Sequence, residues 1–280
     1  MRFTQDGRTA PAANGRGAFS RRGSAMAFAL ILGMLAGAPA DAADVLVEPV
    51  PEAKPPAPEW SFDVTPYFWM ASLSGTASAF GAPPVDVDMR FGDILKDLHM
   101  SVMLASQARR GRFSLSTDLI YISMSSGAST PFQVLADRAD LKVKTLEMTA
   151  LAGYAVVDDE RVQIDLVGGP RLWHVEDTIA LKGGLLNGRS FSDQATWVDA
   201  MAGVRGRFAL TERIHLTGTA LAGGGSSAFA WDVLGGLSYD VGDNFSATIG
   251  YRGLGVDYDD DGFEFDMKMH GPMIGATLRF

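Results

Sequence analysis

The fold is decided by Gly271-Pro272-Met273-Ile274-Gly275-Ala276-Thr277-Leu278-Arg279-Phe280, the last stretch of the 280-residue chain. Its even positions are apolar, among them Ile274 and Phe280, whereas its odd positions include Thr277 and Arg279. Successive side chains of a strand point to opposite faces, so this pattern predicts a strand with one apolar and one polar face. Such a strand fits either a soluble sandwich or a barrel whose outer face meets lipid.

The first 42 residues have the composition of an export signal. Basic residues such as Arg21 and Arg22 precede an apolar run from Ala25 to Gly37, and Ala40-Asp41-Ala42 forms a small-x-small cleavage site. The apolar run is shorter than the roughly 20 residues that a membrane-spanning helix needs. We therefore expect a cleaved signal peptide over residues 1–42, with a short N-terminal membrane anchor as the alternative.

Residues 43–59 are rich in proline, with Pro49, Pro51, Pro55, Pro56 and Pro58. Proline favours an extended, semi-rigid chain without a packed core. We expect a periplasmic leader here, followed by one domain over residues 60–280.

The chain is acidic, with a formal net charge of −9, and it contains no cysteine. An acidic balance argues against nucleic acid as a partner, because phosphate backbones attract basic proteins. The lack of cysteine excludes disulfides, thiolate metal ligands and a cysteine nucleophile. We expect no cofactor.

From residue 60 onward, alternating segments follow one another in pairs, and we count ten strands, with a range of eight to twelve. Short turns are expected at residues 110, 158, 211 and 243, and longer loops near residues 80, 127, 187, 225 and 260. Transmembrane barrels have short turns at one end and longer loops at the other, whereas a sandwich has no reason to sort them. The fold class predicted is all-β, a closed antiparallel transmembrane β-barrel.

Two prolines predict irregular pairing. Pro66 lies inside the first strand, where it removes a hydrogen-bond donor from the ladder. Pro272 predicts a ladder defect, because on its N-terminal side the apolar residues switch parity to Phe265, Met267 and Met269.

Residues 72–98 form the longest interruption between strands. They include a short candidate strand, 85–89, and a segment, 92–98, in which Ile94, Leu95 and Leu98 have helical spacing. The helix fits two places, a cover over the rim of the barrel or a plug inside its lumen.

Charged residues recur on the face opposite the apolar one, and a dry core would not tolerate so many ions. The residues predicted to line the lumen are Asp63, Arg109, Asp118, Glu147, Asp165, Arg171, Asp199, Arg205 and Arg252. Arg171, Arg205 and Arg252 would face Asp118, Asp165 and Asp199, either as a charged constriction that filters solutes or as an ion-pair ladder that fills a closed barrel. Aromatic residues near the ends of the apolar face predict two girdles at the membrane surfaces, formed by Tyr154, Phe208, Phe245, Tyr239 and Phe280 on the turn side and by Tyr121 and Phe229 on the loop side.

Several motifs resemble a poorly characterised family of Gram-negative outer-membrane, porin-like β-barrels: Trp60-Ser61-Phe62-Asp63-Val64-Thr65-Pro66-Tyr67, Arg110-Gly111-Arg112, Gly250-Tyr251-Arg252 and the final strand. The resemblance implies a location in the outer membrane, contact with its lipid and lipopolysaccharide, and recognition of Phe280 by the barrel-assembly machinery. It implies no catalytic residue and no substrate.

Two further groups of polar residues carry weaker signals. The acidic segment near residue 260 offers a weak calcium candidate, Asp257, Asp259 and Asp261, although its spacing does not match a known calcium loop. The four histidines lack metal-binding spacing, and alternation places His174 and His270 on the outer face. We therefore expect a narrow porin-like channel for small solutes without enzymatic activity. The alternative is a closed structural or adhesion barrel, and an outer-membrane hydrolase is the third possibility.

Overall fold

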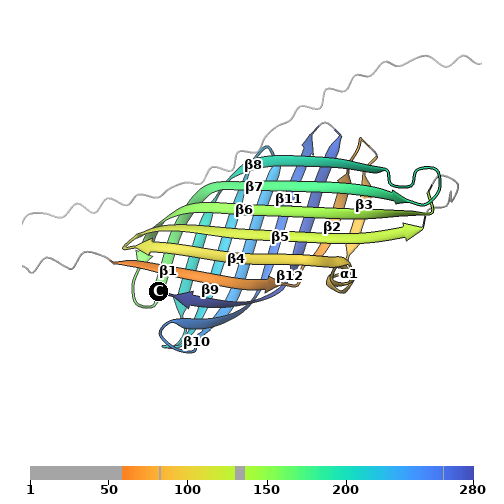
Figure 1. Cartoon of the computed structure of the whole chain (residues 1–280). Helices are drawn as coiled ribbons and strands as arrows, with labels where there is room; N and C mark the ends of the chain where they lie inside the picture. The colour runs from red at the N-terminus through yellow and green to blue at the C-terminus, as the bar shows by residue number, and fades with distance from the viewer. Residues whose placement is uncertain (1–58, 82, 130–135, 261) are drawn as a thin grey trace, which may run out of the picture. The chain divides into compact units, whose positions relative to one another are not determined.

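The computed structural model describes residues 59–81, 83–129, 136–260 and 262–280. The signal peptide expected over residues 1–42 lies outside these residues, as does the expected leader apart from Glu59. Ten antiparallel strands close into a barrel (Figure 1). They are β1 (Trp60–Trp69), β4 (Leu98–Arg110), β5 (Phe113–Ser129), β6 (Arg138–Asp158), β7 (Val162–Lys182), β8 (Ser190–Ala209), β9 (Ile214–Gly225), β10 (Phe229–Asp240), β11 (Phe245–Asp260) and β12 (Phe263–Arg279).

The first and last strands close the barrel. β1 pairs with the C-terminal part of β12, from Asp63 opposite Arg279 to Trp69 opposite Met273. The backbone groups of Phe62 and Phe280 also exchange two hydrogen bonds. This closure confirms the predicted barrel and the count of ten strands, and it pairs the first strand with the last, as a sheet that spans a membrane requires.

Two further strands and one helix lie between β1 and β4. β2 (Ser72–Ser78) pairs with the N-terminal part of β12, and β3 (Val85–Met89) pairs with β2. The expected strand over residues 85–89 is thus present, as an addition to the sheet and not as a wall strand of the closed barrel. Helix α1 (Phe91–Asp97) then leads into β4, and no helix of the described residues is long and apolar enough to cross a membrane.

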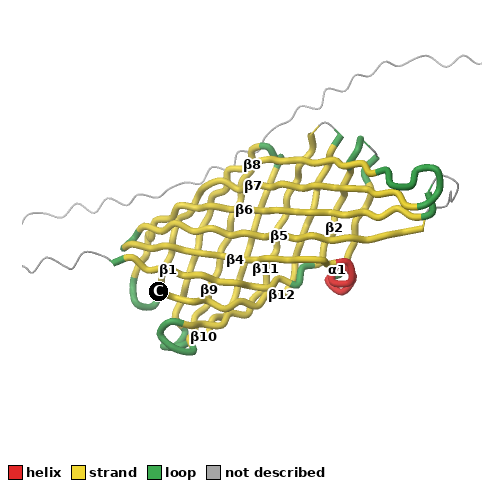
Figure 2. The backbone as a smooth tube through the Cα atoms, in the orientation of Figure 1, coloured by secondary structure: helices red, strands yellow, loops and turns green. Residues whose placement is uncertain are grey.

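The four short turns fall where they are predicted, at one end of the barrel, which we call the turn end (Figure 2). Asp159 shapes the turn between β6 and β7, because its carboxylate accepts hydrogen bonds from the backbone N–H groups of Val162 and Arg161 at 2.7 and 2.9 Å. These two hydrogen bonds hold the pKa of Asp159 below its usual range.

At the other end, the loop end, the strands run further than the sequence predicts. Residues 257–260, expected in a loop, belong to β11, and β12 begins at Phe263. Likewise β5 continues to Ser129. The ladder continues past the apolar stretch because backbone pairing does not require apolar side chains, and polar side chains replace apolar ones on the outer face there.

The hydrophobic pattern inverts along the barrel axis. On β7, Leu166 faces outward with 53% of its surface exposed, whereas Trp173 and Val175, nearer the loop end, face the lumen with 2% and 1% exposed. The outward neighbours of these two residues are His174 and Glu176. The turn half therefore presents an apolar band to lipid, and the loop half packs its apolar side chains inside, as a protein in water does.

The predicted ladder defect at Pro272 is wrong, and this inversion explains the change of parity on which the prediction was based. β12 stays in register with β11 along its whole length, with Pro272 opposite Tyr251. The apolar parity changes because the surroundings change from lipid to water, not because the strand slips by one residue.

Pro66 has the predicted effect. The ladder between β1 and β4 ends where Pro66 lies opposite Leu104, since proline has no N–H to donate. Beyond this point the backbone N–H of Trp69 donates to Met103 Sδ at 3.3 Å instead of to a strand carbonyl.

Helix α1 covers this break from outside. Phe91 at its start packs edge-on against Phe68, an outward-facing residue of β1, with ring centroids 5.9 Å apart. None of its residues is buried. The alternative of a lumenal plug over residues 92–98 is therefore wrong, and the helix lies against the outer wall.

The junction at which β12 passes from β2 to β1 depends on Gly271. A Cβ atom there would lie 2.0 Å from the carbonyl oxygen of Met70, a backbone atom that cannot move aside. We expect Gly271→Ala to destabilise the barrel by about 1–3 kcal/mol, because the clash must be relieved by shifting a strand. Gly235→Ala, where a Cβ meets nothing within 4 Å, is the matched control. Urea unfolding in lipid vesicles, followed by tryptophan fluorescence, measures both, and equal midpoints would contradict the close approach.

Candidate functional site

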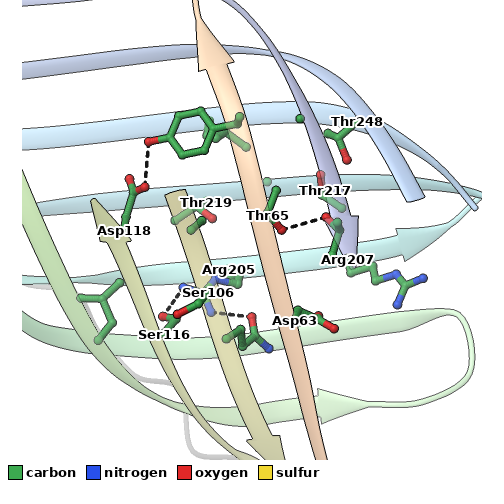
Figure 3. A pocket seen from close by; sticks show the side chains of 18 of the residues that line it. Asp63, Thr65, Ser106, Ser116, Asp118, Arg205, Arg207, Thr217, Thr219 and Thr248 are labelled. Carbon is green, nitrogen blue, oxygen red and sulfur yellow. Dashed lines mark hydrogen bonds between the residues drawn. The ribbon is translucent and has the colours of Figure 1, made fainter. Parts of the chain in front are cut away.

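The turn half of the lumen contains a cavity of about 500 Å³. Its wall carries six arginines, four aspartates and many threonine and serine residues. Figure 3 shows Asp63, Arg205 and Arg207 together with Thr65, Thr217 and Thr248 around this space. The side chains of Arg207 and Arg279 at the turn end are 41% and 27% exposed, so the cavity opens there.

A buried ion-pair network forms the inner end of the cavity. Asp232 on β10 bridges two arginines, with Oδ2 2.7 Å from Arg171 Nη2 and 2.7 Å from Arg252 Nη2. Arg252 also reaches Asp118 on β5 at 2.6 Å, and Arg171 Nε lies 3.0 Å from Glu147 Oε1 on β6. The network thus crosses the lumen and ties strands from opposite walls together.

Neutral groups complete the network. The Tyr67 hydroxyl donates to Asp118 Oδ1 at 2.7 Å and accepts from Arg252 Nη1 at 2.9 Å. Arg252 also lies over the indole ring of Trp69, 5.3 Å from its centroid. Since buried charges are costly unless several partners meet them, these contacts explain why the arginines are stable in the centre of the barrel.

A second polar layer lies between the network and the turn end. Arg109 pairs with Asp165, and Arg205 donates to Gln107 Oε1 at 3.0 Å and to Ser116 Oγ at 2.7 Å. Both partners of Arg205 are neutral, and within the described part of the chain it makes no ion pair. Arg109 Nη1 and Asp165 Oδ1 are buried without a hydrogen-bond partner among the described residues.

Asp240 organises the rim at the turn end. Its carboxylate lies 2.6 Å from His215 Nε2, 3.1 Å from Arg279 Nη2 and 3.5 Å from Arg207 Nη2. One carboxylate thus contacts two arginines and a histidine, and Asp63 is a second carboxylate in the wall that contains these arginines.

The loop half of the lumen is filled by aromatic side chains. Trp173 and Trp197 stack with centroids 5.8 Å apart, and Tyr258 stacks on Trp197 at 4.1 Å. Phe265 packs against both tryptophans at 6.0 and 5.8 Å. None of these four side chains lines the cavity.

The residues predicted to line the lumen all lie on the inner face, but they have different surroundings. The cavity wall contains Asp63, Arg109, Asp118, Asp165, Arg171, Arg205 and Arg252. Glu147 lies behind the wall, fully buried against Arg171. Asp199 departs from its predicted role, because its carboxylate accepts hydrogen bonds from the backbone and hydroxyl of Ser227 at 2.8 and 2.7 Å and pairs with no arginine of the described residues.

Sequence reasoning did not single out Asp232, which holds the network together. The alternation of Phe229, Trp231 and Val233 on the outer face was a sufficient signal that Asp232 points inward. Its pairing with two arginines from other strands has no signal in the local sequence.

The remaining predicted residues lie away from the cavity. Asp257 and Asp259 face outward near the loop end and Asp261 lies outside the described residues, and no group of three potential metal ligands occurs among the described residues. On the outer surface, His174 Nδ1 forms a hydrogen bond of 2.7 Å with Thr196 Oγ1. His270 Nδ1 forms one of 2.7 Å with the Tyr251 hydroxyl. Phe280 is exposed at the turn end, and its role as an assembly signal stays a prediction.

Comparisons with solved structures return bacterial outer-membrane proteins at low similarity. The outer membrane protease OmpT of Escherichia coli matches with a TM-score of 0.48 and 11% identity over 80% of this chain and 97% of that one. The attachment invasion locus protein Ail of Yersinia pestis gives 0.34 and 15% over 79% and 98%, and the Neisserial surface protein A gives 0.33 and 14% over 79% and 97%. No protein-family model and no curated protein matches.

At these TM-scores the likeness carries no conclusion about function. The assignment of the architecture rests on the structure of this chain, which is a closed antiparallel sheet with an apolar outer band and a charged lumen. This is the architecture of an outer-membrane β-barrel.

We expect Asp232→Ala to destabilise the barrel by about 3–5 kcal/mol, because it leaves Arg171 and Arg252 buried without their shared carboxylate. Asp257→Ala makes the same change on the outer surface and should alter the stability by no more than about 0.5 kcal/mol. Urea unfolding in lipid vesicles measures the difference. Equal losses in both variants would show that the network contributes no more than an exposed carboxylate.

Proposed function

We propose that this protein is a closed outer-membrane barrel with an ion-paired lumen, which acts as a structural or surface-interacting protein of the envelope. The observation that carries the proposal is the filling of the loop half. Trp173, Trp197, Tyr258 and Phe265 pack against one another where a channel would need water. This supports the closed alternative over the porin-like channel.

A hairpin adds a second layer of closure at the loop end. The connection between β2 and β3 reaches β8, where the backbone N–H of Phe80 donates to Asp193 Oδ2 at 2.6 Å. Ala79 packs against the aromatic core, and Ser78 Oγ accepts from the backbone N–H of Glu264 at 3.1 Å. The hairpin therefore holds one side of the loop end against the other.

The outer surface of the loop half suits contact with other molecules outside the membrane. It is polar and held by ion pairs between neighbouring strands, such as Lys144 with Glu176 at 2.9 Å. Because the sheet continues beyond the apolar band, this surface is formed by paired strands as well as by loops. In this proposal the turn end faces the periplasm, as the short turns of such barrels do.

A narrow porin-like channel is the second candidate. The depth of the cavity favours it, since the open space extends from the turn end to Arg171 and Arg252. A channel would require both the ion-pair network and the aromatic packing to move aside. The closed form needs no such rearrangement.

Conductance in planar lipid bilayers separates the two candidates. We expect the folded protein to produce no conductance steps and to leave the swelling rate of liposomes in small sugars unchanged. A general porin inserted in the same lipid is the positive control, and heat-modifiable migration in gels shows that the inserted protein is folded. Reproducible steps from folded protein would overturn the closed barrel in favour of the channel.

A further inference from the structure

We propose that the loop-end edge of β8, residues 190–196, binds an extended basic peptide segment of another protein, which adds to the sheet as a further strand. The proposal deepens the surface-interacting role proposed above and rests on it in placing the loop end outside the membrane. Its test measures peptide binding by the folded protein, so its outcome is separate from the conductance measurement.

The loop-end part of β8 has a paired neighbour on one side only. β7 pairs with β8 along its length as far as Phe208, whereas β9 pairs with β8 only from Asp199 onward. β9 ends at Gly225, opposite Asp199, so it does not continue beside residues 190–196. β8 is therefore the border of the strands β5 to β8, which run side by side toward the loop end (Figure 1).

The backbone groups on the open side of this edge lack partners. The C=O of Arg189 accepts from Leu181 of β7 at 2.8 Å, whereas the C=O of Val198 accepts from Ser226, beyond β9, at 3.2 Å. Odd-numbered residues of β8 therefore bond to β7, and even-numbered residues point to the open side. Within the described part of the chain, no hydrogen bond reaches the C=O groups of Ser190, Ser192, Gln194 and Thr196 or the N–H groups of Ser190, Ser192 and Thr196. Such an edge is a template on which another strand pairs.

The opening beside this edge is bounded on its far side by β11. The pairing of β10 with β11 ends at Phe229 opposite Asp257, and β11 continues to Asp260. Among the described residues, β8 and β11 thus both lack a paired strand over the hairpin of β9 and β10. An added strand would occupy the place of a longer β9.

The side chains of the edge indicate which peptide fits. On the outer face Ser192 and Thr196 are polar, whereas on the inner face Phe191 is 53% exposed and Ala195 is buried. A strand that alternates polar and apolar residues matches both faces. Its apolar side chains cover Phe191 and its polar ones stay in water.

Two carboxylates select the charge of the peptide. Asp177 of β7 lies directly opposite Asp193 of β8, and by alternation both face the inside. Asp193 accepts from the backbone N–H groups of Phe80 at 2.6 Å and Gln194 at 2.9 Å, and neither carboxylate forms an ion pair among the described residues. Burial and the charge of Asp193 raise the pKa of Asp177 to about 6.

A lysine opposite Asp193 stabilises both carboxylates, because opposite charges on facing strands attract. A second copy of this chain fits less well. Antiparallel pairing of β8 with its own copy at full overlap places Asp193 against Asp193, and like charges directly opposite are destabilising. The edge therefore favours a basic segment of a different protein.

The probe is the peptide Thr-Val-Thr-Lys-Thr-Val-Thr, which places its lysine opposite Asp193 when it pairs antiparallel along the edge. We expect saturable binding to the folded protein in a zwitterionic detergent at neutral pH, measured by fluorescence anisotropy of the labelled peptide. The same peptide with N-methylated threonines keeps its side chains but loses the donors that face β8, and it should bind about tenfold or more weakly. No binding of the probe, or equal binding of the methylated peptide, would overturn the proposal.

Two variants of Ser192 locate the site. Ser192→Pro removes an N–H group on the open side and leaves the hydrogen bonds to β7, which belong to odd-numbered residues. It should weaken binding by about tenfold or more. Ser192→Ala is the matched control, because it keeps the N–H group and should bind like the wild type. Heat-modifiable migration verifies that both variants are folded, and equal affinity of both would place the peptide elsewhere.

A glutamate in place of the peptide's lysine tests the charge. It should weaken binding by about tenfold or more, and Asp177→Asn should reduce this difference. Equal binding of the two peptides by the wild type would overturn the basic segment. Sedimentation of the protein alone tests the other occupant, since a dimer that Ser192→Pro abolishes would assign the edge to a second copy.

Discussion

The pairing of β1 with β12 is the constraint on which the rest of the structure depends. A strand in hydrocarbon must satisfy every backbone donor and acceptor within the protein, so a ten-strand sheet is stable there only when it closes. The seam achieves this with two kinds of pairing, β1 along the C-terminal part of β12 and β2 along its N-terminal part. Where Pro66 removes a donor from the adjoining ladder, α1 covers the outside of the break.

Closure of the sheet also determines which side chains fill the inside of the barrel. In the turn half the apolar side chains face the lipid and the polar ones face the lumen. The arginines buried there therefore need partners. In the loop half water surrounds the barrel, so the same inward positions carry Trp173 and Trp197. One continuous sheet therefore encloses a polar cavity at one end and an apolar core at the other, and Asp232 with its two arginines lies at the boundary between them.

The sequence predicts the direction of side chains far better than their partners. Period two places Arg205 and Asp118 on the inner face, because alternation along a strand is a local property. The partner of Arg205 is Gln107, 98 residues away in the sequence, and the contact depends on strand tilt and on the length of the side chain across the lumen, neither of which is local. For the same reason Asp199 meets Ser227, a residue of the next hairpin, and not an arginine.

The change of apolar parity on the N-terminal side of Pro272 reflects a change of surroundings and not a break in the backbone. Phe265 and Met267 do have the opposite parity to Ile274, but a pattern of apolar residues records where they are buried and not where the backbone breaks. In a barrel that projects from the membrane, burial changes sides at the membrane surface while the register continues. A change of apolar parity without a bulge or an insertion therefore marks the height at which a strand leaves the lipid, and it places the aromatic core of this protein above that height.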